Sequence, residues 1–208
     1  MLEKYLIEYC APTLASLKTA NMFRIPYASD IVLKQQIMHW NEQLYIKGIV
    51  LIVLKKCNCS ALIYVCRLSS LTADLKKPGN VNFLKKCGYF SCDAISAINT
   101  LKNRLSENSS FPHEIGIFLG YPLGDVIGFI ANEGKNCKCC GCWKVYCNET
   151  EAKKCFIKYK KCKDVYFKLW NKGRSVLQLT VAAWHIFYKF LERGIIYEQN
   201  CSCILERN

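Results

Sequence analysis

Two short runs of β-branched, aliphatic and aromatic residues constrain the fold more than any other feature of the chain. Residues 48–54 (GIVLIVL) form a continuous aliphatic run, and residues 61–67 (ALIYVCR) form a second one after the polar stretch 55–60. Runs of this length and composition indicate strands, and the polar connection between them indicates a β-hairpin. Two more strands are expected, one over residues 115–119 and one over residues 143–147.

Most of the remaining sequence has helical periodicity. In the segment 92–107, for example, Ile95, Ile98 and Leu101 fall on one helical face. Helices are therefore expected over residues 2–9, 12–20, 30–46, 70–77, 92–107, 122–132, 149–172 and 175–192. Helices combined with hairpin-linked strands predict an α+β fold, with helices packed around a small antiparallel sheet. Since no Pro/Ser/Gly-rich linker divides the sequence, we expect a single domain over residues 1–208.

Charge and cysteine content bear on the compartment and on the partners. Lys and Arg number 29 and Asp and Glu 16, which gives a formal net charge of +13, and 15 residues are cysteines. The N-terminal residues lack the basic stretch and apolar core of a secretory signal, and no apolar run approaches the ~20 residues that span a bilayer. The expected location is therefore the cytoplasm, where thiols stay reduced.

Cys10 is the leading candidate for a nucleophile. It lies two residues before Pro12, a residue type that suits the first turn of a helix, so a helix over 12–20 would begin beside the thiol. The N–H groups at a helix start favour the thiolate, which is the nucleophilic form of cysteine. The alternative interpretation of Cys10 is a small thiol buried in the core.

His113 is the leading candidate for a general base. It follows Pro112 and precedes the expected strand over 115–119, where a side chain can be held beside a cleft. The two other histidines, His39 and His185, lie inside expected amphipathic or aromatic helices, where packed or surface positions are the simpler interpretation.

Three segments carry a resemblance to a known family: YCAPTLASLKTANMF (9–23), FPHEIGIFLGYPLGDVIGFIANEG (111–134) and GCWKVY (141–146). The chain resembles a family of clostridial proteins of unknown function, and within it the closthioamide synthetase type. Enzymes of that type resemble papain-like cysteine peptidases but form amide bonds instead of hydrolysing them. The resemblance implies a papain-like fold in which Cys10 is the nucleophile and His113 the base.

The resemblance also implies a reaction within nonribosomal peptide (closthioamide-type) antibiotic biosynthesis. Cys10 would take an acyl group from a phosphopantetheine thioester on a carrier protein, and a diamine such as diaminopropane would then attack the acyl-enzyme. His113 would accept the proton of the amine. No cofactor is implied beyond the carried thioester, and no metal. Lys18, Asn21 and Tyr121 lie in the shared motifs and are expected to bind substrate.

Two carboxylates could complete the catalytic group. A papain-like enzyme would carry its third residue on the next strand, but residues 142–147 contain no Asn, Asp or Glu. Glu114, the neighbour of His113, is the first choice, and Asp125 is the second. Adjacent strand residues point to opposite faces, so Glu114 could orient His113 only if the backbone bends there.

A cluster of cysteines admits a metal site as an alternative. Its members are Cys137, Cys139, Cys140, Cys142 and Cys147. Thiolates this close together can ligate zinc or an iron–sulfur cluster. Their spacing does not match a standard two-plus-two knuckle, however, so a reduced, loop-borne cluster is the expected state.

A basic segment suggests the kind of partner. Residues 153–174 contain nine Lys or Arg and one Asp. This segment could be a solvated helix face or a docking surface for an acidic acyl or peptidyl carrier protein, with nucleic acid as the rival partner. The alternatives to an amide synthase are a peptidase or thioesterase with the same Cys–His pair and a non-enzymatic metal- or nucleic-acid-binding protein.

Overall fold

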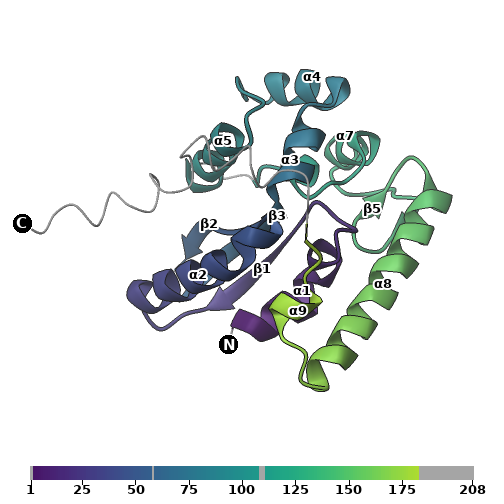
Figure 1. The fold of residues 1–208 in the computed structure, drawn as a ribbon. Helices are drawn as coiled ribbons and strands as arrows, with labels where there is room; N and C mark the ends of the chain where they lie inside the picture. Colours follow the sequence, from purple (N-terminus) through teal and green to yellow (C-terminus); the bar gives the residue numbers. More distant parts are fainter. Residues whose placement is uncertain (1, 58, 108–110, 183–208) are drawn as a thin grey trace, which may run out of the picture.

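A three-stranded antiparallel sheet lies between two groups of helices in the computed structural model, which describes residues 2–57, 59–107 and 111–182 (Figure 1). The strands are β1 (Ala20–Pro26), β2 (Ile49–Cys57) and β3 (Ser60–Arg67), in the order β1–β3–β2. The expected α+β class with a small antiparallel sheet is thereby confirmed, as is the hairpin of the two aliphatic runs.

The helices occupy most of the chain on either side of this sheet. They are α1 (Leu2–Leu14), α2 (Asp30–Leu44), the 3-10 turn η1 (Tyr45–Lys47), α3 (Leu68–Leu75), α4 (Pro78–Lys86), α5 (Ala94–Glu107), α6 (Ile115–Phe118), α7 (Leu123–Ala131), α8 (Glu149–Asn171) and α9 (Val176–Leu179). A second, two-stranded sheet pairs β4 (Cys139–Cys140) with β5 (Lys144–Val145) between α7 and α8.

Both faces of the central strand β3 are buried. Leu62, Tyr64 and Cys66 pack with α3, α5 and α6 on one face, while Ile63 and Val65 pack with α1 and α2 on the other. A strand covered on both faces has no polar side to present to water, so its sequence is a continuous apolar run and does not alternate. This explains why β2 and β3 were recognisable from composition.

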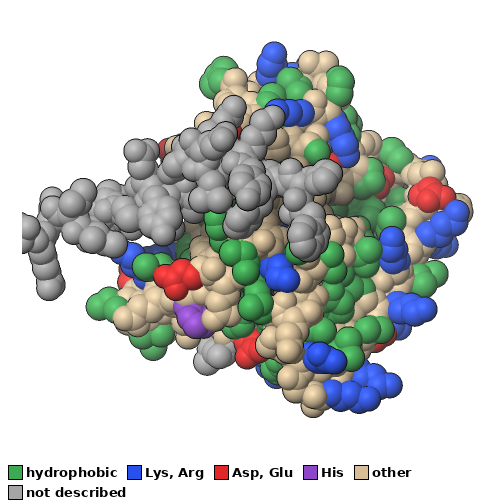
Figure 2. Space-filling model, viewed as in Figure 1, with side chains coloured by type: hydrophobic (Ala, Val, Ile, Leu, Met, Phe, Trp, Pro, Cys, Tyr) green, Lys and Arg blue, Asp and Glu red, His purple; other side chains and the backbone are tan. Residues whose placement is uncertain are grey.

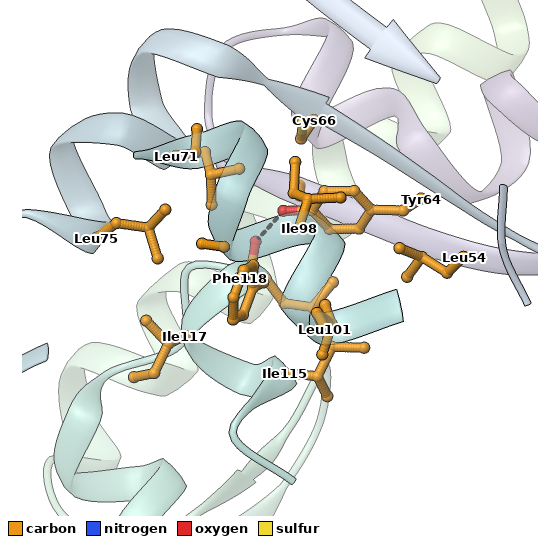
Figure 3. Close-up of a cluster of buried hydrophobic side chains, with 14 of the residues drawn as sticks. Leu54, Tyr64, Cys66, Leu71, Leu75, Ile98, Leu101, Ile115, Ile117 and Phe118 are labelled. Atoms are coloured by element: carbon orange, nitrogen blue, oxygen red, sulfur yellow. Dashed lines mark hydrogen bonds between the residues drawn. The ribbon is translucent and has the colours of Figure 1, made fainter. Parts of the chain in front are cut away.

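A buried hydrogen bond joins strand β3 of the sheet to the short helix α6. The Tyr64 hydroxyl donates to the Phe118 carbonyl oxygen at 2.6 Å, inside the cluster that includes Leu71 and Leu101 (Figure 3). The bond satisfies a polar group at the end of α6 that would otherwise be buried without a partner. It therefore fixes α6, and with it the turn that carries His113.

The expected helix over 12–20 is wrong. One helix, α1, runs from Leu2 through Pro12 to Leu14, and a turn then leads into β1 at Ala20. Pro12 lies in the last turn of α1, where the helix is about to end, and its carbonyl oxygen accepts from the N–H of Leu17 at 2.8 Å. Pro12 thus marks the end of a helix and not its start.

Two of the expected strands also differ. Residues 115–119 form the single helical turn α6 because a short apolar run is buried equally well as a strand or a helical turn. Of residues 143–147, only Lys144–Val145 pair as a strand. The helix expected over 149–172 is confirmed as α8, whereas 175–192 reduces to α9 within the described residues, and positions 183–192 lie outside them.

Candidate functional site

A pocket of about 290 Å³ lies beside α6, α7 and the β4–β5 hairpin. Its walls are mainly apolar and aromatic, and include Phe111, Val126, Phe129 and Trp143. Its polar lining residues are His113, Tyr121, Asp125, Cys140 and Lys144. Apolar walls with a few convergent polar groups are typical of a site for a small organic molecule.

His113 lies at the edge of this pocket with an exposed side chain. Its ring centroid is 4.9 Å from that of Phe129 and 5.9 Å from that of Phe111, so two aromatic rings flank the imidazole. His113 precedes a helical turn, because Gly116 donates its N–H to the His113 carbonyl oxygen at 3.2 Å. The expected position beside a buried strand is therefore replaced by one in a turn above α6.

The Glu114 carboxylate bonds to groups other than His113. Its Oε1 accepts from Arg104 Nε at 2.6 Å and from the Tyr89 hydroxyl at 3.1 Å. The carboxylate is buried, and an ionised group in that position needs such partners. Glu114 thus ties the turn to α5, and through the backbone it fixes the place of its neighbour, His113.

Asp125 also has its hydrogen-bonding capacity taken up by other groups. Its Oδ1 accepts from the backbone N–H groups of Tyr146 and Cys147, each at 2.8 Å, and its Oδ2 accepts from Trp143 Nε1 at 2.8 Å. Asp125 is buried, and these three bonds hold the β4–β5 hairpin against α7. In the part of the chain that the structure describes, no hydrogen bond joins either Glu114 or Asp125 to His113.

Cys10 lies inside α1 and is completely buried. Burial raises the pKa of the Cys10 thiol well above its ordinary value, and the nearby charges of Lys18 and Lys163 lower it only in part. The expected activation of Cys10 by the start of a helix is therefore wrong, because the thiol belongs to the second half of a helix. Cys10 does not line the pocket that holds His113.

Lys18 is the unexpected feature of this region. Only 8% of the residue is exposed, and its Nζ lies 4.9 Å from the ring centroid of Tyr121. Burial lowers the pKa of Lys18 to about 8; the thiols of Cys142 and Cys10 oppose this, and Lys163 adds to it. The structure thus places Lys18 against Tyr121 and within electrostatic range of Cys10.

Tyr121 connects Lys18 to the pocket. Its ring lines the pocket and stacks on Trp143 at a centroid distance of 5.0 Å, and its hydroxyl donates to the Cys142 carbonyl oxygen at 3.1 Å. Burial, with a smaller contribution from the Cys142 thiol, raises the pKa of Tyr121 to about 12, so the phenol remains protonated at neutral pH.

Asn21 has a position in the framework around this region. Its Oδ1 accepts from the Thr13 hydroxyl at 2.8 Å, which ties the start of β1 to the end of α1. Three of the sequence-predicted residues, Cys10, Lys18 and Asn21, therefore lie around the junction of α1 and β1. His113 belongs to the pocket, and Tyr121 lies between the two groups.

Sequence reasoning missed Trp143, Lys163 and Cys142 as parts of this region. Trp143 and Cys142 stand in the GCWKVY segment, whose aromatic and thiol side chains were a usable sign. Lys163 was hidden among the other lysines of α8, and only the packing of α8 against α1 singles it out.

The cysteine cluster on the β4–β5 hairpin consists of free thiols. Among the described residues, no three His, Cys, Asp or Glu side chains are grouped so that they could hold a metal ion. His185, Cys201 and Cys203 lie outside the described residues.

Helix α8 presents a row of lysines to solvent, visible at the right of the molecule in Figure 2. Lys153 and Lys154 pair with Glu149 and Glu151, at 2.7 and 2.8 Å. The exposed residues Lys158, Lys160, Lys161 and Lys168 have no ion pair with any described residue. Within the described ranges, every helix is too short or too polar to cross a membrane.

Comparison with known proteins gives one finding. Residues 6–180 match the model of a family described as "Protein of unknown function (DUF3793)". No curated protein matches the chain. No solved structure matches it either. The match spans the site region, from α1 to the end of α9, and the chain belongs to the DUF3793 family.

Proposed function

We propose that this protein is a cysteine-dependent acyltransferase of papain-like type that forms amide bonds, with Cys10 as nucleophile and His113 as base. The observation that carries the proposal is the position of Lys18, a buried cation whose charge lowers the pKa of the Cys10 thiol and whose Nζ lies 4.9 Å from the ring centroid of Tyr121. Tyr121 lines the pocket that also contains His113. Tyr121 thus links the surroundings of Cys10 and Lys18 to the pocket of His113, which supports the proposal.

Each group would have a defined part in the reaction. The Cys10 thiolate attacks the carbonyl carbon of a phosphopantetheine thioester, and the carrier thiolate leaves as the acyl-enzyme thioester forms. An amine, for which diaminopropane is the proposed example, then attacks this thioester and Cys10 leaves. His113 accepts the proton that the amine loses. The Lys18 ammonium favours the Cys10 thiolate at both ends of the cycle.

The pocket favours aminolysis over hydrolysis. Phe111 and Phe129 flank the His113 ring, and Trp143 adds apolar surface to the wall of the same pocket. Such surface holds few waters, and water is the competitor of the amine for the acyl-enzyme. Closthioamide-type nonribosomal peptide biosynthesis is the proposed setting.

The burial of Cys10 sets a condition on this reaction. With 0% of the residue exposed, a thioester can reach the thiol only after a neighbouring element moves. The elements that bring charged or ionisable groups near Cys10 and Lys18 are α8, through Lys163, and the β4–β5 hairpin, through Cys142. We therefore expect acylation of Cys10 to be gated by movement of α8 or of the hairpin.

Intact mass after exposure to an acyl thioester tests the nucleophile. The wild type should gain one acyl group that maps to Cys10, and Cys10→Ala should gain none while remaining folded. Cys140→Ser is the matched control, because Cys140 lines the pocket beside His113 but should not carry the acyl group. If the label maps to Cys140 and persists in Cys10→Ala, the assignment of Cys10 is wrong.

The base is tested by His113→Ala. Amide formation should slow by roughly 10²–10⁴-fold, which is the usual contribution of a positioned acid–base group. His39→Ala is the control, since His39 is exposed on α2 and bonds only to Gln43 at 2.9 Å among the described residues. Equal rates for the two variants would remove His113 from the mechanism.

We propose an acidic carrier protein as the partner of α8, because four of its exposed lysines, Lys158, Lys160, Lys161 and Lys168, lack ion pairs among the described residues. Attraction between a basic surface and an acidic protein is screened over about 8 Å at physiological salt, so the rate with a carrier-bound donor should fall as salt rises. Changing Lys158, Lys160 and Lys161 together to Glu should lower that rate and leave the rate with a small thioester unchanged.

The same lysines favour a second candidate function, binding of nucleic acid without catalysis. A short oligonucleotide would then bind the wild type with a steep salt dependence and bind the triple Glu variant weakly. A protein that shows this binding and no acylation of Cys10 would support the second candidate over the first.

A further inference from the structure

Lys18 is a buried cation without a counterion among the described residues. It is 8% exposed, and it forms no ion pair and no side-chain hydrogen bond with the part of the chain that the structure describes. Its Nζ contacts the face of the Tyr121 ring, at 4.9 Å from the centroid. A cation–π contact recovers only part of the hydration that an ammonium group loses on burial.

The groups around Lys18 come from four parts of the fold. The Tyr121 ring contacts it from the segment before α7, and its pKa responds to the charges of Cys10 on α1, Cys142 on the β4–β5 hairpin and Lys163 on α8. None of these four residues is a carboxylate, and one of them is a second cation. Two lysines and no carboxylate among these groups leave the local charge positive.

The Lys18 backbone is held in place independently of this charge. The N–H groups of Leu17 and Lys18 both donate to the Pro12 carbonyl oxygen, at 2.8 and 3.2 Å. The Tyr159 hydroxyl donates to the Leu17 carbonyl oxygen at 3.3 Å. The turn between α1 and β1 is thus anchored to α1 and α8, which fixes the place of Lys18 beside Tyr121.

We infer that Lys18, together with Lys163 one helical turn after Tyr159 on α8, forms a binding site for a small anion, a carboxylate or a phosphate group, at the junction of α1, α8 and the β4–β5 hairpin. An anion there would supply the missing counterion of Lys18 and would accept hydrogen bonds from its ammonium group. The anion site and the apolar pocket are neighbours, because Tyr121 belongs to both. One molecule could therefore place its anionic end beside Lys18 and its apolar body in the pocket. This inference concerns binding alone and does not depend on the proposed acyl transfer.

Titration of the free protein with acetate and with inorganic phosphate tests the inference, with chloride at equal ionic strength as the reference. The readouts are the unfolding midpoint and the NMR signals of ¹³C-labelled lysine side chains, with the Lys18 signal identified by its loss in Lys18→Met. We expect at least one of the two anions to shift the Lys18 signal saturably and to raise the midpoint. The affinity of the protein for that anion should fall at least tenfold in Lys18→Met and severalfold in Lys163→Gln.

Two further variants make the outcome decisive. Lys160→Met removes an exposed lysine from α8 and should bind the anions as the wild type does. The rival explanation is that the Cys142 thiolate is the counterion of Lys18, in which case anions would bind only to Cys142→Ser. Three results would overturn the inference. They are anion binding by Cys142→Ser alone, no saturable shift in the wild type, and equal anion binding by the wild type and Lys18→Met. Because no acyl donor is present, none of these outcomes bears on the acylation of Cys10.

Discussion

Replacing Lys18 by Met should stabilise the protein at neutral pH, although most substitutions of buried residues destabilise. Met has a similar length and no charge, so it can fill the same space beside Tyr121 without an unpaired cation. Burial lowers the pKa of Lys18 from an ordinary value of 10.5 to about 8. A difference of about 2.5 pKa units corresponds to about 3 kcal/mol of folding free energy that is recovered when the charge is removed.

The dependence of this gain on pH has a definite sign. Between pH 8 and 10.5 the unfolded chain holds the Lys18 proton more tightly than the folded chain, so the stability of the wild type rises with pH in that window. The penalty is present in full below pH 8 and is relieved as the pH approaches 10.5. The advantage of Lys18→Met over the wild type should therefore be constant from pH 6 to about 7.5 and shrink steadily towards pH 10.

Urea unfolding of both proteins at several pH values measures this difference. Comparison of the two chains cancels the opposite contribution of buried thiols such as Cys66, whose pKa is raised by burial in both. Chloride should be the only anion, so that no carboxylate or phosphate pairs with Lys18. Lys160→Met should leave the stability within about 0.5 kcal/mol of the wild type, as is usual for an exposed position. A gain for Lys18→Met that is absent, or that persists unchanged to pH 10, would refute the reasoning.

Three other substitutions test the framework around the pocket. Tyr64→Phe should lower the free energy of unfolding by about 1–3 kcal/mol, because the Phe118 carbonyl oxygen loses its buried donor; calorimetry measures it. Glu114→Gln should lower the free energy of unfolding by about 1–3 kcal/mol, because it removes the charge that faces Arg104. In a double-mutant cycle, the same substitution should cause no loss when Arg104 is already Gln. Asp125→Asn should place an amide against Trp143 Nε1 and lower the free energy of unfolding by about 1–3 kcal/mol. The tryptophan fluorescence should change, and an unchanged spectrum would contradict the role given to this carboxylate.

The sequence predicted the hairpin of β2 and β3 because burial on both sides leaves a continuous apolar run, a pattern visible without the fold. It did not predict β1, in which Arg24 and Pro26 are exposed and only some positions are buried. The pairing of β1 with β3, from Ala20↔Cys66 to Pro26↔Ser60, is a long-range interaction that no local pattern reports. Tertiary pairing, more than local propensity, makes this segment a strand.

The position of Cys10 shows the same limit at the level of chemistry. Pro12 is compatible with the first turn of a helix, and that interpretation placed the Cys10 thiol at a helix start. In the structure the helix expected over 2–9 continues through Pro12, because Leu2, Leu6 and Cys10 share a face that packs against the sheet. The apolar face extends the helix through a residue that would end it in isolation.

Cys10 and His113 could be selected from their reactive side chains alone, whereas Lys18, the residue that the fold marks most clearly, was expected to bind substrate only through the family resemblance. A thiol or an imidazole is a candidate wherever it occurs, so Cys10 and His113 could be named without knowing their surroundings. A lysine becomes unusual only when it is buried, and Lys18 is buried in a turn that Tyr121 and Tyr159 contact from far away in the sequence. The cost of burying that cation must be offset by something that approaches it, whether the Cys10 thiolate of a catalytic cycle or an anion from solution. The unpaired charge of Lys18 thus bears on both proposals, although an anion can bind beside it whether or not Cys10 is acylated.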